Sequence, residues 1–96
     1  MAKDIATLLR PIDADSASAG GGGADIGPIG ALGVPTMSPA VDGTRYFWYH
    51  HSDADTIDKL DPKEMAECVA LMAVFAYVVA DMPERFPRSP VRTRAP

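Results

Sequence analysis

The sequence predicts an α/β fold, because two of its segments favour strands and two favour helices. Residues 34–41 form the first strand candidate, and their prolines suit the edge or end of a sheet. Residues 44–50 form the second, since they are rich in aromatic β-formers. The helix candidates are the short segment 26–32 and the long apolar segment 62–82. A length of 96 residues allows at most one small domain of this class.

The long helix has the clearest signals of any element. Asp61 is a good N-cap, Pro62 fits the first helical position, and Glu64 places a carboxylate at the positive end of the helix. Pro83 stops the helix. After Glu67 the segment is apolar nearly all round, and such a helix needs cover on several sides. The other elements offer too little cover, so we expect the isolated chain to fold poorly and to associate.

An amphipathic helix is predicted at the start of the chain. Ile5, Leu8 and Leu9 fall on one face of this helix, and Pro11 is expected to end it. Residues 13–24 have no periodicity and no large apolar side chain, which indicates a flexible linker or a tight glycine turn rather than a phosphate-binding loop.

Two glycines and two aspartates mark the boundaries in the middle of the chain. Asp25 is placed to cap the short helix 26–32, and Gly33 is placed to end it. Asp42 and Gly43 form a turn signal between the two strand candidates.

The overall charge argues against a nucleic-acid partner. The net charge is −4 and the calculated pI is about 4.9, so phosphate neutralisation by the body of the protein is not expected. Residues 87–96 are predicted to be a flexible tail rich in Pro and Arg, and the four C-terminal arginines are expected to be solvated: Arg85, Arg88, Arg92 and Arg94. No uncharged run reaches the length of a membrane span, and no signal-peptide pattern follows Met1. The single cysteine, Cys68, excludes an internal disulfide and is expected to be a buried thiol.

Residues 46–56, YFWYHHSDADT, hold the densest group of reactive side chains. In an extended segment His50 and His51 would point to opposite faces, so at most one of them would enter a given site. Asp53 or Asp55 could help to hold a metal, but a catalytic zinc usually takes three protein ligands and no motif supplies them. Two interpretations stay open from spacing alone: polar residues at a strand end, or a small metal site using His50, His51 and Asp53.

Three stretches of the chain resemble a known family. They are GGGGADIGPIGALGVPTM at 20–37, DGTRYFWYHHSDADTIDKLDPKEM at 42–65 and MAVFAYVVADMPERFPRS at 72–89. Together they resemble the C-terminal part of the di-zinc exopeptidases, in the plasma glutamate carboxypeptidase (carboxypeptidase Q) branch with its bacterial aminopeptidase and carboxypeptidase relatives. The pattern H-S-x-x-D-T, followed by Asp-Pro and an apolar helix, carries most of the likeness.

The resemblance implies a role for each residue of that pattern. His51 takes the position of the last zinc ligand. Asp55 and Thr56 take positions that fix the loop or orient the ligands without binding the metal themselves. His50 stands where many relatives have a tyrosine, so the role of that tyrosine is not carried over; a contact of His50 with the oxyanion or the substrate stays open. The implied fold is the C-terminal portion of a three-layer α/β/α domain with a mixed sheet, over residues 1–86.

The resemblance also implies an activity for the complete protein. That activity is hydrolysis of peptides or dipeptides with two zinc ions, whose other ligands and general base lie upstream of this segment. The 96-residue chain alone is expected to be inactive. A homodimer and a secreted or periplasmic location are in keeping with the family. The alternative is a non-catalytic interaction or remnant protein that associates through its apolar terminal helix.

Overall fold

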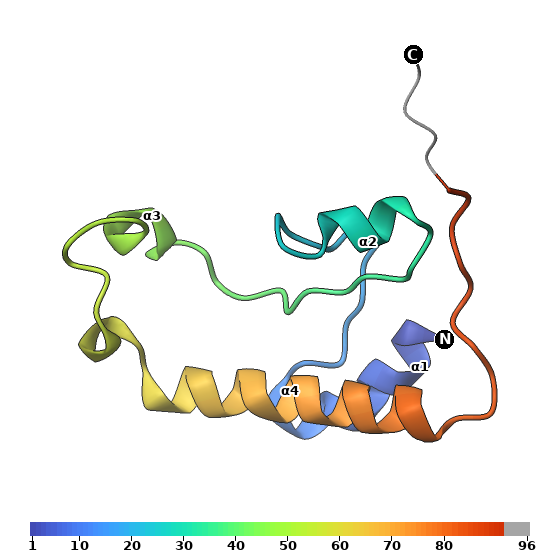
Figure 1. The fold of residues 1–96 in the computed structure, drawn as a ribbon. Coiled ribbons are helices and arrows are strands. Elements are labelled where there is room, and N and C mark those ends of the chain that lie inside the picture. Colours follow the sequence, from blue (N-terminus) through green and yellow to red (C-terminus); the bar gives the residue numbers. More distant parts are fainter. Residues whose placement is uncertain (92–96) are drawn as a thin grey trace, which may run out of the picture.

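A computed structural model describes residues 1–91, and that part of the chain folds into helices joined by extended segments, without a strand (Figure 1). The elements, in order, are α1 (Ala2–Ala6), the 3-10 helix η1 (Thr7–Ile12), α2 (Gly27–Ala31), α3 (Tyr46–Tyr49), the 3-10 helix η2 (Ile57–Lys59) and α4 (Pro62–Asp81). The predicted α/β fold with a mixed sheet is therefore wrong for the described residues. Residues 92–96, which include Arg92 and Arg94 of the predicted tail, lie outside them.

Helix α4 confirms the prediction for the long apolar segment. The carboxylate of Asp61 accepts hydrogen bonds from the backbone N–H of Lys63 at 2.7 Å and of Glu64 at 3.2 Å, which satisfies two free amides of the first turn. The last helical residue is Asp81, and Pro83 follows one residue after the extended Met82. Cys68 lies on this helix and is half-buried.

The buried core consists of Ile5, Ala6 and Leu9, where α1 and η1 pack against α4. Leu8 is predicted to share this face, but 59% of its surface is exposed. The prediction is wrong for Leu8: the chain continues after Ala6 as η1, and Leu9 rather than Leu8 is the residue of η1 that is buried, in the region where η1 packs against α4. The 3-10 helix also continues through Pro11, which is expected from the sequence to end the helix.

Helix α2 occupies the predicted short segment, but its start differs. Ile26 is the N-cap residue and no side chain caps the helix, so the predicted role of Asp25 is wrong. Gly33 ends the segment as predicted, with a left-handed φ of 81°. The backbone N–H of Ser89 donates to the Gly33 carbonyl at 3.2 Å, which ties the end of the described chain to α2.

Neither strand candidate forms a strand. Residues 34–41 are extended but have no ladder partner among residues 1–91, and residues 44–50 contain α3 instead. A strand needs a neighbouring strand to receive its hydrogen bonds, whereas a helical turn satisfies them locally. In α3 the backbone N–H of His50 donates to the Tyr46 carbonyl at 3.0 Å.

The molecule is flat and expanded. Its principal extents are 42 × 40 × 19 Å, and its radius of gyration is 15.8 Å. A compact domain of this length would have a radius of gyration of about 12.5 Å. Helix α4 runs along one side, and α2 and α3 lie along the opposite side (Figure 1). Among residues 1–91, no helix has both the length and the apolar character that crossing a membrane requires.

Candidate functional site

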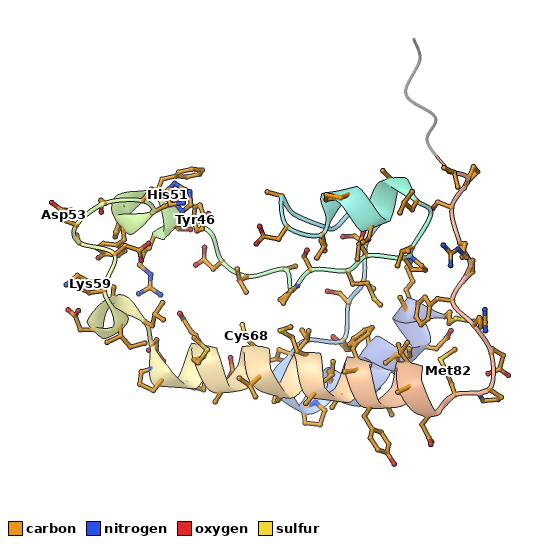
Figure 2. All side chains as sticks on the ribbon, in the orientation of Figure 1. Tyr46, His51, Asp53, Lys59, Cys68 and Met82 are labelled. Atoms are coloured by element: carbon orange, nitrogen blue, oxygen red, sulfur yellow. The ribbon has the colours of Figure 1, made fainter. Side chains whose placement is uncertain are left out.

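The two histidines follow directly after α3, at the point where the chain reverses (Figure 2). His50 is extended, with φ −50° and ψ 124°, and His51 has a left-handed φ of 55°. Ser52 closes the turn, because both its backbone N–H and its hydroxyl donate to the Tyr49 carbonyl, at 3.0 and 2.6 Å. His51 therefore occupies a backbone conformation that non-glycine residues seldom adopt.

The rings of His50 and His51 lie against each other. Their centroids are 3.7 Å apart and their planes are inclined by 24°. The prediction that the two side chains point to opposite faces is wrong, because it assumes an extended segment. The left-handed backbone at His51 returns its ring to the side on which His50 lies.

A third ring extends the stack. Tyr46 lies on His50 with a centroid separation of 4.3 Å and an interplanar angle of 26°. The Tyr46 hydroxyl and His50 Nε2 are 3.3 Å apart, within hydrogen-bonding distance. Tyr46 and His50 are four residues apart at the end of α3, which is the spacing that places two side chains on one face of a helix.

The imidazole of His51 is exposed, while that of His50 is half-buried. None of the hydrogen bonds found among residues 1–91 involves the His51 ring. The ring is therefore accessible to a ligand that arrives from outside this segment. A neutral imidazole with an accessible nitrogen is a suitable zinc ligand.

The described residues do not assemble a complete metal site. Within residues 1–91, no group of three or more His, Cys, Asp or Glu side chains is placed to hold a metal ion. The interpretation as a small metal site formed by His50, His51 and Asp53 is thus not supported. His51 fits the chemistry of a single ligand, and further ligands are needed to complete a zinc site.

Asp55 and Thr56 lie in the loop after the histidines and brace it locally. The backbone N–H of Asp55 donates to the Ser52 carbonyl at 3.0 Å. The Thr56 hydroxyl donates to the carboxylate of Asp58, which also receives a hydrogen bond from Lys59 Nζ at 2.6 Å. Lys59, and after it Thr56, lower the pKa of Asp58 to about 2.

An ion pair joins the two ends of the loop. The Arg45 guanidinium, just before α3, lies 3.0 Å from both carboxylate oxygens of Glu64, in the first turn of α4. Glu64 thus pairs with a residue on the other side of the loop, and its carboxylate also lies at the positive end of α4. Sequence reasoning does not find this pair; its only signal is opposite charge 19 residues apart.

Several known proteins are similar to nearly the whole chain. Carboxypeptidase Q from Mus musculus is 44% identical to it over 87 residues, and the proteins of the same name from Rattus norvegicus and Homo sapiens are 42% and 41% identical over 87 residues. The resemblance to carboxypeptidase Q is confirmed. The match covers 91% of this chain but only 18% of the length of each relative. No family model matches the chain, and no solved structure matches it significantly.

Proposed function

We propose that the chain is part of a zinc-dependent exopeptidase that hydrolyses peptides or dipeptides, in which His51 supplies one zinc ligand. The carrying observation is the match to carboxypeptidase Q over 91% of the chain, which includes the histidine loop. The exposed imidazole of His51 supports the proposal, since it is accessible from outside the segment. The low coverage of the relatives, 18%, supports the expectation that the other ligands lie in further sequence.

In such an enzyme the zinc ions would activate a water molecule and polarise the carbonyl of the bond that is cut. Residues of this chain would supply one ligand to that site and shape the loop beside it. His51 would contribute a neutral imidazole, and His50, beside it, would be the candidate contact for the substrate. Asp55 and Thr56 would keep the loop in shape through the contacts to Ser52 and Asp58 described above.

A second candidate function is non-catalytic association through α4. Large apolar side chains on this helix remain exposed, with exposed fractions of 58% for Val69, 59% for Met72 and 71% for Tyr77. An apolar surface of this kind is typical of a site where another protein surface packs. This candidate gives His51 no metal-binding role, and the two functions therefore differ in zinc binding.

The first experiment is to sequence the DNA upstream of the Met1 codon in the native source. An open frame that encodes further His, Asp and Glu residues several hundred bases earlier would support the exopeptidase. A stop codon and a ribosome-binding site just ahead of Met1 would overturn it in favour of association through α4.

The second experiment measures zinc in the intact protein that carries these residues. His51→Ala is expected to remove about one of the two zinc ions and most of the peptidase activity, because a ligand is lost. Asp53→Ala is the matched control, because Asp53 is a nearby exposed carboxylate that the exopeptidase proposal does not use as a zinc ligand. This variant is expected to keep its zinc content and its peptidase activity. An unchanged zinc content in His51→Ala would contradict the ligand role.

A further inference from the structure

The Tyr46–His50–His51 stack, defined as the three rings of these residues, has a feature that the ligand role of His51 does not require. Its middle ring is held from one side by Tyr46, through ring stacking at 4.3 Å and through the hydroxyl 3.3 Å from Nε2. Its other side carries the His51 ring at 3.7 Å. Each ring therefore limits the rotation of the next one.

The stack depends on two separate backbone features. The helical hydrogen bond from the His50 N–H to the Tyr46 carbonyl sets the first pair of rings on one face of α3. The left-handed φ of 55° at His51 sets the second pair, since an extended residue there would turn its ring away. Tyr46 lies at the far end of the stack and so makes no ring contact with the proposed ligand itself.

The contact between the Tyr46 hydroxyl and His50 Nε2 can run in either direction, because the role of the ring nitrogen depends on the tautomer of His50. If its Nε2 accepts from the Tyr46 hydroxyl, the neutral ring carries its proton on Nδ1. The Nε2 lone pair is then occupied and does not compete with His51 for a metal. In that tautomer His50 would be a spacer between Tyr46 and the proposed metal ligand His51, with its Nδ1–H available to donate elsewhere.

We propose that Tyr46 is a positioning residue for His51: it fixes the His50 ring, which in turn confines the His51 imidazole to one orientation. This inference rests on the proposed zinc-ligand role of His51. Residues that orient a ligating histidine typically contribute about 10- to 100-fold to metal affinity. Because Tyr46 acts through a second ring, we expect an effect near the lower end of that range.

The test uses the intact protein that carries these residues and measures its zinc affinity by competition with a chelator. Tyr46→Leu removes the ring and the hydroxyl, and is expected to weaken zinc binding by about tenfold. Tyr46→Phe keeps the stacked ring and removes only the hydroxyl, so a smaller loss is expected. Tyr49→Leu is the matched control, because the Tyr49 ring contacts Trp48 and lies outside the stack. The zinc affinity of this variant is expected to equal that of the wild type.

A second readout separates positioning from a general loss of structure. In ¹⁵N-histidine NMR of the zinc-free protein, Tyr46→Phe is expected to shift His50 from the Nδ1–H towards the Nε2–H tautomer while the circular dichroism spectrum stays the same. Tyr46→Leu is expected to move the His51 ring protons downfield as the stack loosens.

The outcomes distinguish this inference from the proposed function. If His51→Ala loses zinc but both Tyr46 variants retain wild-type affinity and wild-type histidine spectra, the positioning role is overturned and the ligand role stands. If His51→Ala binds zinc like the wild type, the ligand role is overturned, and the positioning role with it.

Discussion

Two regions of the molecule, the packed core at α1 and the histidine loop between α3 and α4, are stabilised in different ways. The core buries Ile5, Ala6 and Leu9 against α4 and uses apolar contact. The loop buries none of its residues and relies on stacked rings, hydrogen bonds and the Arg45–Glu64 ion pair. Exposed ion pairs of this kind contribute about 0–1 kcal/mol each and are weakened by salt, whereas full burial of a large apolar side chain contributes about 1.5–3 kcal/mol. The proposed ligand His51 thus lies in the part of the chain that is held least firmly.

The largest effect is expected in the core. Leu9→Ala removes a side chain that is only 4% exposed and should lower the free energy of unfolding by about 2–5 kcal/mol. Leu8→Ala is the matched control at an exposed position and should change it by less than about 0.5 kcal/mol. Urea titration followed by circular dichroism measures both. Equal effects would show that the packed region is not the one described.

A smaller effect is expected where the end of the described chain meets α2. Gly33 has a φ of 81°, and an added Cβ would clash with the Ser89 carbonyl oxygen. Gly33→Ala should therefore destabilise this contact by about 1–3 kcal/mol and speed amide exchange at Ser89. In Gly30→Ala the added Cβ would lie 3.5 Å from the Thr36 methyl group, an ordinary contact, so Ser89 exchange should stay slow. Fast exchange at Ser89 in the wild type would argue against the contact.

The smallest effect is expected from pH in the loop. The pKa of Asp58 in the fold is about 2, below its ordinary value of 3.8, so ionised Asp58 stabilises the loop. This contribution is complete above about pH 4 and is lost as the pH falls through about 2. In an NMR titration, Lys59→Met should raise the Asp58 pKa towards 3.8, because Lys59 is the main cause of the shift. A titration midpoint that stays near 2 in the variant would assign the shift to Thr56 instead.

The same contrast explains which parts of the fold the sequence predicts. Asp61, Pro62 and Pro83 act within one or two turns of their own positions, so the sequence predicts α4 almost to the residue. The aromatic content around Tyr46 predicts a strand, but strand propensity depends on a neighbouring strand that residues 1–91 do not supply. Local sequence signals are therefore sufficient to predict α4 but not to predict α3.

The sequence selects candidate residues for the site but does not predict their geometry. The H-S-x-x-D-T pattern is enough to single out His51, Asp55 and Thr56. The stacking of His50 on His51 depends on one left-handed residue, and no sequence rule predicts a positive φ at a histidine followed by serine. The Arg45–Glu64 pair is likewise beyond sequence reasoning, since it requires knowing how the loop closes.

The left-handed backbone at His51 also restricts how position 51 can be redesigned. Among common metal-binding side chains, histidine and aspartate tolerate this region of φ and ψ comparatively well, while glutamate and cysteine do not share that preference. An attempt to exchange the donor atom from nitrogen to oxygen should therefore begin with aspartate, even though glutamate has the longer reach. The backbone at position 51 thus limits the choice of donor atom as well as the direction of the side chain.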